Sequence, residues 1–203
     1  MQKKNLSKFI TIIMLLAVLG TVGSIPFYFE SPSIFYKTGL DKIMLRTGKI
    51  LGIFTVVLLL IQLVLISRFS VLDKLWGLKQ LFHFHRINGL ILLTLAIVHP
   101  VLILGADHFV FFPFELKYWP EFIGTLLLLI LTIFIGISFW QKKLGIQYKP
   151  WRLFHKLMAP AILFLMVVHV YNVSRTFESG VPFYTLGLGA VIAVCLVIRK
   201  YLK

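Results

Sequence analysis

Six apolar stretches, each 16 to 19 residues long, make up about half of the 203-residue sequence and lie at 9–25, 50–66, 87–104, 122–140, 153–171 and 183–198. A hydrocarbon core about 30 Å thick is crossed by roughly 20 residues of helix, since each adds about 1.5 Å. Within lipid the backbone has to satisfy its own hydrogen bonds, and a single apolar stretch does so only as a helix. The sequence therefore predicts an all-α integral membrane protein, a bundle of six transmembrane helices.

Composition agrees with lipid as the main solvent. Hydrophobic residues make up 59% of the chain and charged residues only 14%, with a mean hydropathy of +0.94. The net charge of +14 does not indicate nucleic-acid binding, because the basic residues fall between the apolar stretches instead of forming one stripe on a soluble module. We therefore expect the lipid bilayer, and no nucleic acid, among the partners.

The chain is expected to form one transmembrane domain over residues 1–203. The longest segments between apolar stretches are about twenty residues, too short to bury a core of their own. The first stretch follows three lysines, as a signal peptide would, but it stays apolar through Ile25 and lacks a clear small-residue cleavage site. We expect it to be a retained helix.

The distribution of lysine and arginine predicts the orientation of the bundle. Segments 1–8, 67–86, 141–156 and 199–203 together carry fifteen of the 21 Lys and Arg residues. Basic residues accumulate on the cytoplasmic side of membrane proteins, so both termini are expected in the cytoplasm and the chain in the cell (inner) membrane as a multi-pass protein. The first outside segment is the exception, with four basic residues, Lys37, Lys42, Arg46 and Lys49.

Histidines recur in the third and fifth helices with one spacing. His85 and His99 are fourteen residues apart, and so are His155 and His169. Fourteen residues make about 3.9 turns, which puts both histidines of a helix on nearly one face, roughly 21 Å apart along its axis. In a hydrocarbon core about 30 Å thick, each helix then carries one histidine toward each membrane surface.

These histidines are expected to meet in pairs. The third and fifth helices run parallel because one helix separates them, so His85 faces His155 near the cytoplasm and His99 faces His169 near the outside. Two facing imidazoles can be the axial ligands of a haem iron, which then transfers electrons instead of binding oxygen. The single cysteine, Cys195, excludes covalent attachment through Cys-x-x-Cys-His. We expect two haems b between these helices, bound to the four histidines, and no further catalytic side chain.

Intramembrane histidines have two other uses. Zinc needs about four ligands around one ion, often from histidines four residues apart, and a fourteen-residue gap prevents this within either helix. Histidines in spans also act as proton relays or as hydrogen-bonded packing residues. A small membrane transporter or proton channel is therefore the alternative function.

Four neighbours of the histidines are candidate haem contacts, each with a second reading. Gly89 follows the first histidine by one turn, where a missing side chain admits a porphyrin or serves helix packing. Arg86 and Lys156 adjoin the two cytoplasmic histidines and either meet haem propionates or belong to the cytoplasmic positive charge. Arg175, in the outer loop after the last histidine, pairs with outer propionates, attracts an anionic acceptor, or is a solvated loop charge.

Two stretches carry a resemblance to a known family. They read FHRINGLIL at 84–92 and YKPWRLFH at 148–155, and each is followed by the second histidine of its helix. Both resemble the transmembrane domain of the ferric reductase and NADPH oxidase superfamily, in specific residues over the third and fifth helices and in topology over the whole chain. The resemblance implies a six-helix bundle that passes electrons through an inner haem and then an outer haem to ferric iron, oxygen or a partner protein. It gives His85 and His155 the inner role, and His99 and His169 the outer role.

The sequence also departs from that family. Most members continue into FAD and NAD(P)H domains, whereas this chain stops at Lys203, near where such a domain would begin. We therefore expect no flavin domain in this chain, a separate flavoprotein or a quinol as electron donor, and an acceptor outside, including an extracytoplasmic protein. The short form is similar to the haem-binding membrane subunit of the bacterial periplasmic methionine sulfoxide reductase system. The full set of four histidines points more toward a general ferric reductase-like oxidoreductase subunit.

Overall fold

The computed structural model describes residues 2–110 and 115–201, except that the side chains of residues 2–4, 200 and 201 lie outside the described part. Lys3, Lys4, Lys200 and Lys203, which contribute to the predicted orientation, are therefore not described. The elements over the described residues are, in chain order, α1 (Gln2–Tyr28), η1 (Pro32–Ile34), α2 (Gly39–Ile66), α3 (Ser70–Trp76), α4 (Leu78–Gly105), η2 (Leu116–Tyr118), α5 (Trp119–Trp140), α6 (Tyr148–Val173), η3 (Arg175–Phe177) and α7 (Gly180–Tyr201). No strand occurs among the described residues, which confirms the all-α prediction.

Six of these helices, α1, α2, α4, α5, α6 and α7, are long and apolar enough to cross a membrane, which confirms the predicted number of spans. Their ends extend beyond the predicted stretches: α2 begins at Gly39 instead of residue 50, and α4 at Leu78 instead of residue 87. A 28-residue helix is about 42 Å long, which matches a bilayer with its headgroups and not the hydrocarbon core alone. The apolar windows detected only the part of each helix that lies in hydrocarbon.

The short helix α3 was not expected from the sequence. It spans seven residues, and its last turn is closed by the N–H of Gly77, which donates to the carbonyl of Asp73 at 3.0 Å. Gly77 has a φ of +78°, a left-handed conformation that glycine adopts without steric cost. This turn redirects the chain into α4.

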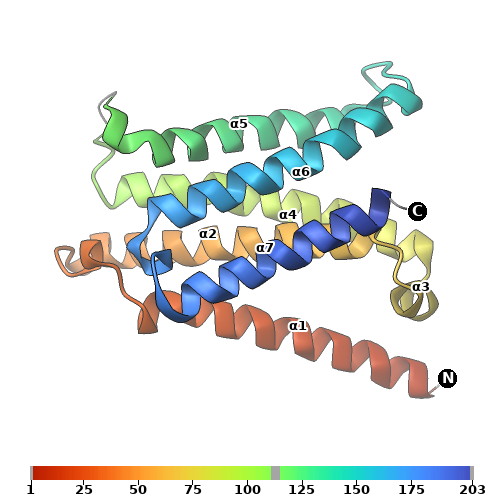
Figure 1. Ribbon diagram of the computed structural model, residues 1–203, viewed down its shortest axis with the longest axis horizontal. Coiled ribbons are helices and arrows are strands. Elements are labelled where there is room, and N and C mark those ends of the chain that lie inside the picture. The colour runs from red at the N-terminus through yellow and green to blue at the C-terminus, as the bar shows by residue number, and fades with distance from the viewer. Residues whose placement is uncertain (1, 111–114, 202–203) are drawn as a thin grey trace.

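The long helices run side by side along the longest axis of the molecule (Figure 1). The end that holds both chain termini and α3 is called the terminal end below, and the end that holds η1 and η3 is called the opposite end. Close packing joins α2 to α4 and α5 to α6, while α1 packs on α2, and α7 packs on both α6 and α2. The histidine-bearing helices α4 and α6 are not closely packed along their lengths within the described residues.

The buried core is apolar and small. One cluster joins α2, α6 and α7, and a second joins α4, α5 and α6 through Leu92, Leu131 and Ile162. Many large apolar side chains point outward, such as Leu16, Leu129 and Phe164. Lipid covers such side chains in a membrane protein, so their exposure costs nothing there.

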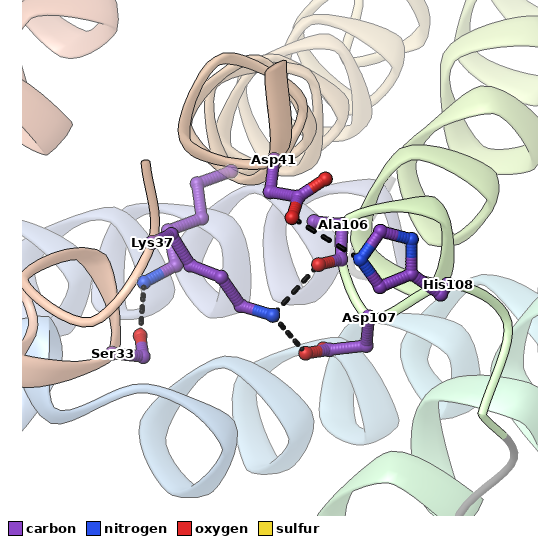
Figure 2. Close-up of polar contacts among 7 residues, drawn as sticks. Ser33, Lys37, Asp41, Ala106, Asp107 and His108 are labelled. Atoms are coloured by element: carbon purple, nitrogen blue, oxygen red, sulfur yellow. Dashed lines mark hydrogen bonds and ion pairs between the residues drawn. The ribbon is translucent and has the colours of Figure 1, made fainter. Parts of the chain in front are cut away.

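A polar cluster ties two connections together at the opposite end (Figure 2). The ammonium of Lys37, which precedes α2, donates to the carbonyl oxygen of Ala106 at 2.7 Å and to the carboxylate of Asp107 at 2.6 Å, both just after α4. The ring of His108 lies 3.3 Å from a carboxylate oxygen of Asp41. These contacts fix the start of α2 against the end of α4.

Four basic residues in the first outside segment do not fit the predicted orientation. Three of them bind carboxylates or hydroxyls near the opposite end. Lys37 pairs with Asp107, and Arg46 forms an ion pair with Glu30 from the end of α1. Lys49 bonds only to serine hydroxyls. The first two charges are thus compensated locally, and Lys49 has no carboxylate bound to it among the described residues.

Candidate functional site

The four histidines divide into two pairs within the bundle. His85 and His155 lie nearer the terminal end and are called the terminal pair, while His99 and His169 lie nearer the opposite end and are called the opposite pair. Each pair takes one residue from α4 and one from α6. The two helices run in the same direction (Figure 1). The first histidines of the two helices therefore lie at one depth in the bundle, and the second histidines lie at another.

In the terminal pair, the imidazole ring centroids are 6.1 Å apart and the ring planes make an angle of 64°. Two imidazoles bound to opposite sides of one metal ion, through metal–nitrogen bonds of about 2.0–2.1 Å, have their centroids roughly 6 Å apart. The separation of His85 and His155 therefore fits one metal ion between them.

Aromatic rings from α5 and α6 surround the terminal pair. Phe134 stacks on His155 with centroids 4.6 Å apart and an interplanar angle of 26°, and Trp151 lies 5.2 Å from the same ring. The hydroxyl oxygen of Ser138 lies 3.2 Å from His155 Nδ1. These contacts orient the His155 ring so that its other nitrogen, Nε2, is the one available to a metal ion.

The opposite pair lines a cavity between α2, α4, α5 and α6. The cavity opens partly outward, and its wall is mostly apolar. The cavity is bordered toward the opposite end by Phe29, Ile34 and Phe177, from the end of α1, η1 and η3.

Backbone carbonyls from neighbouring helices bind both histidines of the opposite pair. His99 Nδ1 donates to the carbonyl oxygen of Gly48 in α2 at 2.7 Å, and His169 Nδ1 donates to the carbonyl oxygen of Pro120 in α5 at 2.9 Å. A carbonyl oxygen only accepts, so Nδ1 carries the hydrogen in each ring. This tautomer leaves Nε2 with a lone pair for a metal ion, the arrangement that metal-bound histidines usually show.

Glycines four residues further along α2 and α5 make room for these rings. A Cβ atom built on Gly52 would lie 2.9 Å from ring atoms of His99, and one built on Gly124 would lie 2.5 Å from Cε1 of His169. Real Cβ atoms do not approach other atoms closer than 3.0 Å. Both rings thus pack on the bare backbone of the adjacent helix, each held by a carbonyl at one position and a glycine one turn later.

An apolar layer separates the two pairs. Leu92 lies midway between the histidines of α4, and Ile162 lies midway between those of α6. Leu131 of α5 completes the layer, and the three side chains are 2%, 3% and 6% exposed for Leu92, Ile162 and Leu131. Each pair therefore occupies its own polar site within an apolar interior.

The four residues predicted to contact haem besides the histidines lie on α4, α6 and η3. A Cβ on Gly89 would meet the amide of Gln62 in α2 at 2.8 Å, so this glycine admits a neighbouring helix. Arg86 is exposed, with its guanidinium 5.9 Å from the ring centroid of Phe139. Lys156 lies among residues of α2, α6 and α7. Arg175 is exposed on η3 and its neighbours line the cavity of the opposite pair. The assignment of these four residues as haem contacts stays a prediction.

Residues around the pairs that sequence reasoning missed come from α2 and α5. They are Gly48, Lys49, Gly52, Pro120, Gly124, Phe134 and Ser138. One signal was present: Gly48 and Gly52 form a glycine pair four residues apart, a pattern typical of close helix packing in membranes. The packing it permits is what brings a carbonyl of α2 to His99.

The ligand set fits a haem better than a bare metal ion. Among the described residues, no group of three or more His, Cys, Asp or Glu side chains could hold a metal ion. A bare zinc ion needs about three or four protein ligands, whereas a haem iron already has four ring nitrogens and needs only two axial ones. Two imidazoles at each site, with the tautomer of the opposite pair set for metal binding, match that need.

Comparison with known proteins gives one match. A family model described as ferric reductase like transmembrane component matches residues 51–167, which is more than half of the 203 residues. The matched region contains His85, His99 and His155 and ends two residues before His169. No curated protein and no solved structure matches the chain.

Proposed function

The chain belongs to the ferric reductase-like transmembrane family, and from this membership we propose that it is a di-haem b-type protein that transfers electrons across a membrane. It is a multi-pass membrane protein, because six of its described helices are long and apolar enough to cross a bilayer and its family is transmembrane. The histidine pairs would hold one haem each, His85 with His155 and His99 with His169.

The observation that carries the proposal is the facing of two histidine pairs at different depths between α4 and α6. The terminal pair has the ring separation expected around one metal ion, and the opposite pair lines a mostly apolar cavity with both Nδ1 atoms bound to carbonyls. A haem at each site supplies one-electron redox chemistry. Two histidines at each site would hold the haem and leave oxygen no place to bind at its iron, which would favour outer-sphere transfer.

The residues of this chain hold and insulate the two sites. The four histidines would bind and orient the haems. The carbonyls of Gly48 and Pro120 set the tautomer of the histidines in the opposite pair. The layer around Leu92 keeps water out of the space between the pairs. No side chain needs to donate a proton for an electron to pass. The protein would then act as an oxidoreductase subunit without a catalytic acid or base of its own.

The charge distribution predicts the orientation of the bundle, and the family resemblance implies transfer from the inner haem to the outer haem. By the positive-inside rule, the terminal end would face the cytoplasm and the opposite end would face the outer side of the cell (inner) membrane. Electrons would then enter at His85 and His155 from a separate flavoprotein or quinol, and leave at His99 and His169 toward an acceptor outside. The acceptor classes are ferric iron, oxygen, a quinone or an extracytoplasmic protein.

A proton channel, the alternative function, finds less support. A relay needs a chain of polar groups or waters between the histidines, and the layer of Leu92, Leu131 and Ile162 lies in that interval. These side chains neither accept nor donate a hydrogen bond. Electron transfer, in contrast, can occur by tunnelling through apolar packing and needs no chain of hydrogen bonds.

Spectroscopy of the purified protein with histidine variants tests the proposal. A reduced-minus-oxidised spectrum with a b-type α band and two haems per chain is expected for the unaltered protein. H85A and H155A should remove one and the same haem, and H99A and H169A the other. H83A should keep both, because His83 is two residues before His85 on α4 and faces about 200° away from it. A colourless unaltered protein with pH-driven ion flux in liposomes would refute the proposal and support the channel.

A further inference from the structure

Lys49 lines the cavity of the opposite pair, and it is the lining residue with a fixed charge among those described. It lies in α2 between Gly48, whose carbonyl binds His99, and Gly52, which backs the same ring. Lys49 is half-buried at the boundary of the apolar stretch of α2, and burying a charge is costly unless it is paired or hydrogen-bonded. Lys49 follows directly after the glycine whose carbonyl binds the candidate ligand His99, so its charge is placed beside that site.

The protein itself supplies hydroxyls to Lys49, with no bound carboxylate among the described residues. The ammonium donates to the hydroxyl of Ser31, and to that of Ser33 at 3.2 Å. Glu30, which precedes Ser31, attracts the Lys49 ammonium electrostatically, but its carboxylate is ion-paired with Arg46. Ser31 is 5% exposed, so one of the two hydroxyls that bind the Lys49 ammonium is buried, while Lys49 itself lines the cavity.

Hydroxyls orient an ammonium without cancelling its charge. Ser31 and Ser33 also lie 2.8 Å from each other through their hydroxyl oxygens, which links the three side chains in one network. A carboxylate in the cavity would accept a hydrogen bond from Lys49 and neutralise it, and such charge-assisted bonds are among the strongest in proteins. The cavity wall is otherwise mostly apolar, so a ligand with an apolar body and an acidic edge is complementary to it.

We propose that Lys49, positioned by Ser31 and Ser33, binds a propionate carboxylate of the haem held between His99 and His169. The inference rests on the proposed function, because the haem is the carboxylate-bearing ligand that the two histidines select. It assigns the anchoring cation to α2 and not to Arg175, which is exposed on η3 and does not line the cavity.

The test compares K49Q with K42Q. Lys42 lies on the same helix seven residues earlier, so its substitution removes the same charge at the same end, and it does not line the cavity. The rate of haem loss from the opposite pair is measured by transfer to an acceptor apoprotein. Loss of one charge-assisted hydrogen bond predicts a rate roughly 10- to 100-fold higher for K49Q, and an unchanged rate for K42Q and for K49R.

Reconstitution with haem dimethyl ester identifies the ligand group, because the ester has no free carboxylate. The difference between the unaltered protein and K49Q should disappear with the ester. The outer haem should also have a lower midpoint potential in K49Q, since a nearby positive charge stabilises the reduced state. The haem at the terminal pair, measured in the same sample, reports whether K49Q is folded.

The outcomes separate the two proposals. Equal haem loss from K49Q and K42Q, or a K49Q effect that persists with the ester, would overturn the assignment of Lys49 and leave the di-haem function intact. Absence of haem from the unaltered protein would overturn both.

Discussion

Gly124 offers the sharpest test of the arrangement around the opposite pair. A Cβ at this position would lie 2.5 Å from Cε1 and 2.8 Å from Nδ1 of His169, whereas ordinary contacts begin at 3.4 Å. In G124A the imidazole therefore has to move by 0.9 Å, the difference between these two distances. The ring is packed between α5 and α6, so a shift of that size changes the direction of its Nε2 lone pair.

The expected loss follows from the bond that the shift breaks. His169 Nδ1 donates to the Pro120 carbonyl at 2.9 Å, and a move of the ring away from α5 lengthens this bond beyond hydrogen-bonding distance. Losing such a second bond of a metal-bound histidine typically lowers affinity about 10- to 100-fold. We expect G124A to release the haem of the opposite pair faster by that factor.

Two further glycines on these helices make the comparison quantitative. At Gly52 the corresponding shift is 0.5 Å, from 2.9 to 3.4 Å against His99, so G52A should have a smaller effect than G124A. At Gly136, also in α5, the nearest atom to an added Cβ is in Trp140 at an ordinary 3.7 Å. G136A gains the same helix propensity, about 1 kcal/mol, without touching a histidine.

Haem loss and electron paramagnetic resonance of the oxidised protein measure these effects. G124A should change the low-spin signal and loss rate of one haem only, G52A should change them less, and G136A should match the unaltered protein. If G124A retains both haems with unaltered signals and rates, the His169 ring is not the ligand that the structure describes, and the reasoning is refuted.

Two other predictions concern the terminal pair and the orientation. S138A removes the hydroxyl 3.2 Å from His155 Nδ1 and should shift the midpoint potential of the terminal haem alone, while T132A, whose hydroxyl bonds the Leu128 carbonyl in its own helix, should shift neither haem in a redox titration. A cysteine at Tyr36, at the opposite end, should react with a membrane-impermeant thiol reagent in intact cells, whereas one at Leu144, between α5 and α6, should react only after permeabilisation, and the reverse pattern would invert the predicted direction of electron transfer.

The helical fold and the pairing of the histidines could be predicted from two features of the sequence, the apolar stretches and the fourteen-residue spacing of the histidines. Apolar length alone indicates a helix in lipid, so the six spans followed directly. Helical periodicity put the histidines of each helix on one face, and chain order made α4 and α6 parallel. These arguments need only local geometry and topology.

The supporting residues could not be predicted in the same way, because they act through the backbone. Gly48 and Pro120 contribute carbonyl oxygens, which every residue has, and Gly52 and Gly124 contribute the absence of a side chain. Their roles depend on which helix face meets which histidine. Lys49 was counted only as a loop charge, since the apolar window of the second helix began after it.

The placement of the opposite pair follows from this use of the backbone. His99 belongs to α4 and His169 to α6, and these two helices are not closely packed on each other in the described part of the chain. A carbonyl of α2 binds His99, and a carbonyl of α5 binds His169. The distance between the two rings is therefore set by how α2 packs on α4 and α5 on α6. Lipid-facing substitutions should leave this distance unchanged, whereas a single methyl group at either of the two helix–helix contacts should alter it.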